Sequence, residues 1–154
     1  MHLFSGGDHT FLLTEDNILY ACGMNTYGQL GVGDNINKSQ FTQVNWFQGT
    51  IKQISCGKEH SFILTDNNEI YSCGRNIEGQ LGSENNLDQN IFRKVNFDKG
   101  EIKEIVSGGY HTILLMKNDD MYLTGWNMFK PEKNGKWNFI NSFQKIEFNL
   151  RIFK

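Results

Sequence analysis

Short runs of apolar residues recur along this chain, and polar turns rich in Asn and Asp separate them. The runs in the middle of the chain are rich in β-branched and aromatic residues, as strands are. We therefore expect strands at residues 51–56, 60–65, 69–74 and 93–96. The run Phe62-Ile63-Leu64 does not alternate with polar residues, which favours a strand that is covered on both faces. The pattern predicts an all-β protein.

The chain repeats itself without gaps. A Gly-x-x-His motif followed by an apolar run begins at Gly6, Gly57 and Gly108, with 51 residues from each glycine to the next. The apolar runs Phe11-Leu12-Leu13 and Ile113-Leu114-Leu115 match the central run, so the same burial on both faces is expected for them. A fixed period of this length is typical of proteins built from stacked or radially arranged units.

The period divides one domain into three units, at residues 1–51, 52–102 and 103–154. Asn and Asp tolerate left-handed backbone angles and so favour turns between the second and third strand of a unit. These turns are expected at residues 15–17, 66–68 and 117–120. Four strands in about fifty residues match the size of a propeller blade. The third unit is degenerate at residues 128–141, where the glycine-rich bend of the other two units is missing.

Each unit runs from Gly-x-x-His through an aliphatic run and a polar turn to Gly-x-Asn, and the first two units continue into Gly-Gln-Leu-Gly. This order of features resembles the regulator of chromosome condensation repeat, a family of β-propellers. Because the family ring has about seven blades, the resemblance implies a partial propeller, an open arc of three four-stranded blades. The residues that carry the structural repeat are Gly6, His9, Gly23, Asn25, Gly28, Gly31, Gly57, His60, Gly74, Asn76, Gly79, Gly82, Gly108, His111, Gly125 and Asn127.

An open arc leaves sheet faces and strand edges uncovered, which invites aggregation unless something covers them. Three explanations stay open. The chain is a fragment or divergent remnant of a longer propeller, or copies associate head to tail and close a ring, or another protein caps the arc.

The sequence offers no catalytic constellation, no cofactor motif and no metal site. His9, His60 and His111 occupy equivalent positions on successive units, about one sheet spacing apart, whereas ligands of one zinc ion must converge on it. We interpret each ring as bonded to backbone at a blade junction. Cys22 and Cys73 are also repeat equivalents without an adjacent base, so we expect them to be small buried side chains.

Positions that differ between units on a shared scaffold are candidates for partner contacts. Two sets differ: the loop between the first two strands, and the residue after the glycine of the third strand. Because the strands run up and down, both sets should emerge on the same face of the ring. The candidate partner face comprises Asp8, Met24, Lys58, Glu59, Arg75, Tyr110 and Trp126.

Net charge and cysteine content narrow the classes of partner and the compartments that we expect. The formal net charge is −2 over 154 residues, without a basic tail, so neither nucleic acid nor an anionic membrane surface is an expected partner. Three cysteines without a Cys-x-x-Cys pair favour a reducing compartment, the cytoplasm or alternatively the nucleus.

We expect a non-enzymatic protein-interaction module with a protein partner, a small GTPase among the candidates. The alternative that the resemblance implies is guanine-nucleotide exchange on a Ran-like small GTPase, although the strict spacing leaves no room for an inserted wedge loop. A fragment of a larger regulatory protein is the other alternative.

Overall fold

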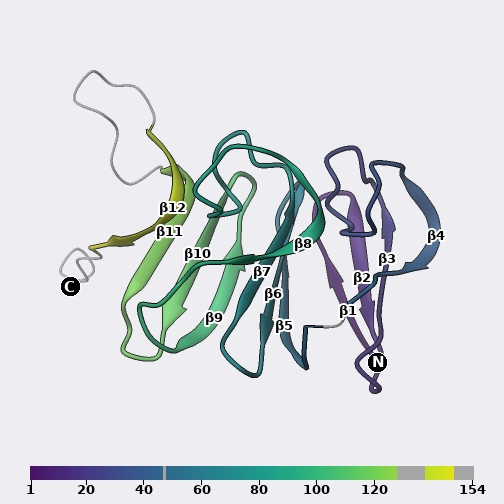
Figure 1. The fold of residues 1–154 in the computed structure, drawn as a ribbon, viewed down its shortest axis with the longest axis horizontal. Helices are drawn as coiled ribbons and strands as arrows, with labels where there is room; N and C mark the ends of the chain where they lie inside the picture. The colour runs from purple at the N-terminus through teal and green to yellow at the C-terminus, as the bar shows by residue number, and fades with distance from the viewer. Residues whose placement is uncertain (47, 128–137, 148–154) are drawn as a thin grey trace, which may run out of the picture.

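Three four-stranded antiparallel sheets make up the computed structural model, which describes residues 1–46, 48–127 and 138–147 (Figure 1). The first sheet contains β1 (His2–Ser5), β2 (His9–Leu13), β3 (Leu19–Gly23) and β4 (Lys38–Gln43). The second contains β5 (Ile51–Cys56), β6 (His60–Thr65), β7 (Ile70–Gly74) and β8 (Gln89–Val95). The third contains β9 (Ile102–Ser107), β10 (His111–Met116), β11 (Met121–Asn127) and β12 (Asn138–Ile146). The predicted all-β arc of three blades is confirmed. The described residues include no helix suited to crossing a membrane.

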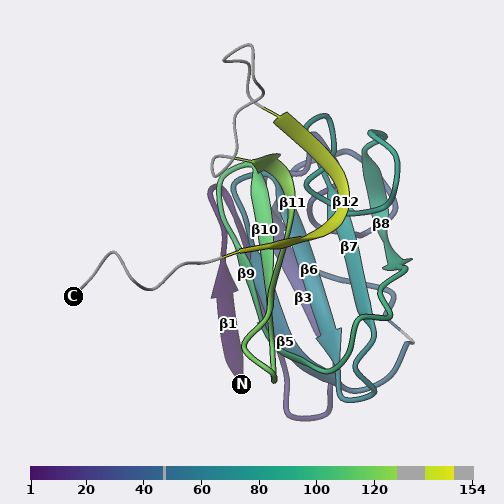
Figure 2. The same ribbon diagram turned by 90° about the vertical axis from the view of Figure 1, so that its left-hand side faces the viewer.

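The sheets stack face against face, as the two views show (Figures 1 and 2). Their first strands lie along one edge of the stack, where Gln53 Nε2 donates to the carbonyl oxygen of Ile105 at 2.7 Å. On the same pair of strands, the amide of Ser107 donates to Ser55 Oγ at 2.9 Å. The fourth strands β4, β8 and β12 lie at the opposite edge of their sheets. This is the radial arrangement of propeller blades.

The strand bounds follow the prediction with one clear difference. The strands at 51–56 and 60–65 are confirmed, and the third begins one residue later than expected. The fourth strand was expected at 93–96 but begins at Gln89. Polar residues at its start weaken the local signal, yet Gly33 of the first blade donates to the carbonyl oxygen of Asn90 at 2.8 Å. Within its own blade Gln89 also pairs with Gly74 of β7, so pairing on both sides sets a strand start that local propensity does not predict.

Two apolar cores fill the two junctions between blades. Phe11, Leu30 and Ile63 belong to the first core, whereas Phe62 and Leu114 belong to the second. All six residues of β6 are buried, because its neighbours cover both of its faces. Burial on both faces was also expected of the equivalent runs in β2 and β10, and this is wrong for both strands. Every second residue there is only half-buried, because each outer blade has one neighbour.

The Gly-x-x-His motif ties neighbouring blades together. In the middle blade the amide of Gly57 donates to the carbonyl oxygen of His60 at 2.8 Å, and the ring lies over the glycine. A Cβ at Gly57 would come within 2.2 Å of the ring, so only glycine fits there. The ring then bonds Thr112 Oγ1 on the third blade, with 2.9 Å from Nε2 to the oxygen. His9 likewise bonds Ser61 Oγ at 2.8 Å.

The expected backbone partner is therefore wrong for His9, whose ring bonds a hydroxyl group. The ring of His60 bonds the hydroxyl of Thr112 and also the backbone of His111 on the third blade. Ser61 Oγ donates its one hydrogen to the carbonyl oxygen of Gln29 at 2.8 Å. It must accept from the imidazole, so Nε2 of His9 carries the proton. Burial lowers the pKa of His9 to about 4 and that of His60 to about 3. Both rings are neutral at physiological pH.

A buried asparagine closes each described glycine bend. Asn76 Oδ1 accepts from the amide of Leu81 at 3.0 Å, while Nδ2 donates to the carbonyl oxygen of Asn85 at 2.9 Å. Asn25 makes the equivalent bonds in the first blade, to Leu30 and Asp34. The degenerate stretch of the third unit falls largely on residues 128–137, outside the described residues.

Candidate interaction face

The two sets of candidate residues meet at one end of the blades, the upper end in Figure 1. Gly74 ends β7 with a φ of 105°, and a Cβ there would lie 2.5 Å from the carbonyl oxygen of Glu59. That close approach lets the amide of Arg75 donate to this carbonyl at 2.9 Å. The same bond joins Met24 to Asp8 and Trp126 to Tyr110. Glycine at the strand end thus holds each pair of candidates side by side.

Arg75 is the centre of this face, and its own neighbours hold it in place. Its guanidinium donates from Nη1 to Glu59 at 2.8 Å and from Nη2 to Glu78 at 2.7 Å. Its Cζ lies 5.5 Å from the ring centre of Tyr27 and 5.2 Å from that of Tyr110, which belong to the first and third blades. The side chain is only 18% exposed. Arg75 therefore links three blades and leaves little of its surface for a partner.

The accessible part of the face belongs to Lys58 and the aromatic pair beside it. Lys58 is exposed, and its Nζ donates to Tyr110 Oη at 2.8 Å. The rings of Tyr110 and Trp126 lie 6.2 Å apart between centres, and both side chains are half-buried. An ammonium group and two amphipathic rings can receive a carboxylate or carbonyl group together with an apolar side chain. Asp8, which is exposed, and the half-buried Met24 extend the face onto the first blade.

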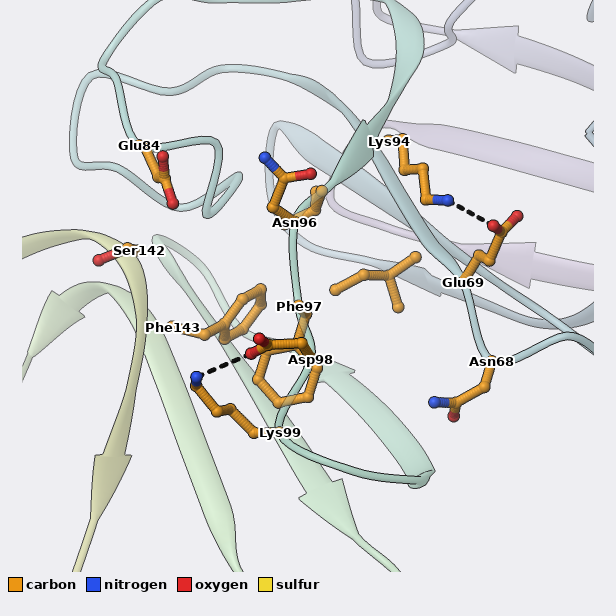
Figure 3. A pocket seen from close by; sticks show the side chains of 12 residues that line it. Asn68, Glu69, Glu84, Lys94, Asn96, Phe97, Asp98, Lys99, Ser142 and Phe143 are labelled. Carbon is orange, nitrogen blue, oxygen red and sulfur yellow. Dashed lines mark hydrogen bonds and ion pairs between the residues drawn. The ribbon is translucent and has the colours of Figure 1, made fainter.

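A cavity of about 620 Å³ opens between the second and third blades (Figure 3). Phe97 and Phe143 line it, with ring centres 5.8 Å apart, and Lys94 pairs with Glu69 in its wall. Lys99 and Asp98 form a second ion pair in its wall, with 2.7 Å between Nζ and the carboxylate. Each of these two lysines is neutralised by its own carboxylate, and Glu84 adds a further carboxylate to the lining, so the wall does not suit an anionic ligand.

The sequence analysis missed this cavity and the aromatic contacts beside it. Phe97 meets Tyr122 of the next blade with 5.2 Å between ring centres, and Trp46 meets Tyr71 in the same way at 5.0 Å. Aromatic residues recur with the 51-residue period, and that recurrence was the available signal. The aromatic pairs are structural contacts of the blade junctions.

The described residues hold no cluster of three or more His, Cys, Asp or Glu suited to a metal ion. Burial raises the pKa of the Cys56 thiol to about 12 and raises that of Cys73 well above its ordinary value, so neither forms a thiolate at neutral pH. The face around Lys58 offers an ammonium group and two aromatic rings for contact with another molecule.

Comparison with known proteins agrees with this architecture. Two family models, both for the regulator of chromosome condensation (RCC1) repeat, match residues 16–64 and 67–115, and residues 2–29 and 51–80. The X-linked retinitis pigmentosa GTPase regulator of Homo sapiens is 32% identical over 130 residues, which cover 82% of this chain and 13% of that protein. A secretion-regulating guanine nucleotide exchange factor of Bos taurus is 41% identical over 78 residues, covering 50% of this chain and 17% of that protein. The chain thus spans less than a fifth of the length of these two relatives.

The solved structure of Prp20p from Saccharomyces cerevisiae, described with its binding properties to Gsp1p and histones, superposes with a TM-score of 0.81 at 22% identity. The superposition covers 97% of this chain and 39% of Prp20p, and it shows that the fold is shared.

Proposed function

Since the chain belongs to the RCC1 repeat family, we propose that it is a non-catalytic interaction module that binds a protein partner with the face around Lys58, Tyr110 and Trp126. The main observation in support is that Arg75 contacts residues of three blades beneath this face and so holds them in place. A preorganised surface loses little conformational entropy on binding. The expected partner presents a carboxylate beside an apolar side chain, and a reducing compartment, the cytoplasm or the nucleus, fits the free cysteines.

Affinity capture with graded variants tests this proposal. Lys58→Ala and Tyr110→Ala should each lower recovery of the specific partner by about tenfold, the scale of an interface hot spot. Lys117→Ala is the matched control, because this exposed lysine lies in the turn at the opposite end of the blade. Equal recovery with Lys58→Ala and Lys117→Ala would contradict the assignment of this face.

Guanine-nucleotide exchange is the second candidate, favoured by the names of the bovine relative and of the human GTPase regulator. A labelled-nucleotide release assay on purified Ran-like GTPase decides between the two. Release faster than the spontaneous rate, and lost with Tyr110→Ala, would support exchange. Binding of the GTPase without faster release would leave a binding module.

A further inference from the structure

The outward faces of the first and third blades carry the two halves of a contact that the chain makes twice internally. At each internal junction a histidine of one blade bonds a hydroxyl of the next, as His9 does with Ser61 and His60 with Thr112. Both pairs are 52 residues apart. The third histidine, His111, and the first hydroxyl, Thr10, have the same places in their blades but lie on the outward faces. Both are half-buried.

The aromatic contacts follow the same rule. At the first junction Trp46 of one blade meets Tyr71 and Phe92 of the next, at 5.0 and 6.1 Å between ring centres. The first blade carries Tyr20 and Phe41 at the positions equivalent to Tyr71 and Phe92. Phe41 is 45% exposed, whereas Phe92 packs against the first core. The outward face of the first blade is thus built like the face that receives a blade inside the molecule.

Apolar side chains surround these positions on both outward faces. Leu3 pairs with Leu12 across β1 and β2 and is 66% exposed. Val106 pairs with Ile113 across β9 and β10 and is 49% exposed. Residues opposite each other in adjacent strands point to the same side of a sheet. Each outward face therefore presents apolar side chains beside polar groups, which are Ser5 and Thr10 on the first blade and Glu104 and His111 on the third. Of these, the hydroxyl of Thr10 and the imidazole of His111 complement each other as their equivalents do inside the molecule.

We propose that the outward face of the first blade binds the outward face of the third blade of a second copy of this chain, head to tail. In this contact His111 Nε2 of one copy bonds Thr10 Oγ1 of the other, and the apolar rows around Leu3 and Val106 pack together. The contact is heterologous, so two of them can close two copies into a ring. It continues the internal junction and does not depend on the proposed partner face.

Blocking each face separately tests the head-to-tail geometry. Sedimentation velocity of the purified chain over about two orders of magnitude in concentration should show reversible association. Leu3→Arg blocks the first face and Val106→Arg blocks the third, and both substitutions lie at exposed positions that should not impair folding. Each variant alone should be monomeric, because every contact needs one face of each kind. An equimolar mixture should form a dimer and nothing larger.

Leu87→Arg is the matched control, because Leu87 is exposed in the loop before β8 of the middle blade, away from both faces, and it should associate like the parent chain. A milder variant, Thr10→Val, keeps the shape and removes the hydroxyl, and it should weaken association about tenfold. A parent chain that stays monomeric at every concentration would overturn the proposal. So would a blocked variant that still self-associates, or a mixture of folded blocked variants that does not dimerise.

Discussion

The middle blade and the two outer blades have the same strand pattern but differ in what covers it. The run Phe62-Ile63-Leu64 is fully buried, whereas Leu12 in the first blade and Ile113 in the third are half-buried. All three runs are equally apolar. A non-alternating apolar run therefore predicts a strand that can be buried on both faces. Whether both faces are buried depends on whether a neighbouring blade lies on each side.

The largest expected difference between the middle and outer blades is in the free energy of unfolding that is lost when equivalent residues are truncated to alanine. Ile63 is 0% exposed in the first core, and Leu12 is its equivalent on the outward face. Ile63→Ala should lower the free energy of unfolding by about 2–5 kcal/mol, because a buried cavity remains. Leu12→Ala should cost about 1 kcal/mol or less, since water already reaches that side chain. Urea unfolding at a protein concentration that keeps the chain monomeric measures both values.

Equal losses for the two variants would contradict the contrast between the blades. A cost for Leu12→Ala that grows with protein concentration would instead show that a second molecule covers the outer face.

Acid should destabilise the fold through the histidines of the junctions. Unfolded histidine has a pKa near 6.5. Burial lowers the pKa of His9 to about 4. Burial, together with the nearby rings of His9 and His111, lowers the pKa of His60 to about 3. The unfolded chain therefore binds more protons between these values, and stability falls as the pH falls through this window. From pH 7 to about pH 5.5 the two groups should remove about 2–3 kcal/mol of unfolding free energy.

Variants assign this pH dependence to the junctions. His60→Gln should reduce the slope of stability against pH above pH 5.5, where carboxylates contribute little. His111→Gln should reduce it less, because the ring of His111 is only half-buried on the outward face. His2→Gln is the control at an exposed position. Equal slopes for His60→Gln and His2→Gln would show that the junction histidines are not responsible.

The local structure was accessible from the sequence because the 51-residue period repeats every local signal. The turns expected from Asn and Asp are confirmed, and Asn17, Asn68 and Asp119 have φ angles of 62°, 63° and 66°. The contacts that these turns make with the next blade could not be predicted from the sequence. Asn68 Oδ1 also accepts from the amide of Ile102 at 2.7 Å and so fixes the start of the next blade. Such contacts depend on how blades pack, which a local pattern does not contain.

For the candidate face, too, the sequence predicted the position of the residues but not their contacts. Strand direction was enough to expect Arg75 and Tyr110 on one face. It could not predict that Glu59 and Glu78 of the same blade would hold the guanidinium, because that requires the loop and side-chain positions within the blade. Nor could it predict the contact with Tyr110, which depends on how the second and third blades pack. The expected contact residue is therefore largely a positioning residue, and the exposed Lys58 is the better probe of binding.

The smallest expected difference in unfolding free energy is between removal of a hydroxyl inside a junction and removal of its equivalent on an outward face. Thr112 Oγ1 accepts from His60 and donates to the carbonyl oxygen of Gln80 at 3.2 Å. Thr112→Val should cost about 1–3 kcal/mol of unfolding free energy, because the imidazole N–H stays buried without an acceptor. Thr10→Val should change it by about 0.5 kcal/mol or less, since the partner of that hydroxyl among the described residues is the exposed Ser5 Oγ at 3.3 Å, and Thr10 is half-open to water. Urea unfolding of the monomeric chain compares the two variants, and equal costs would mean that the histidine–hydroxyl bond does not hold the blades together.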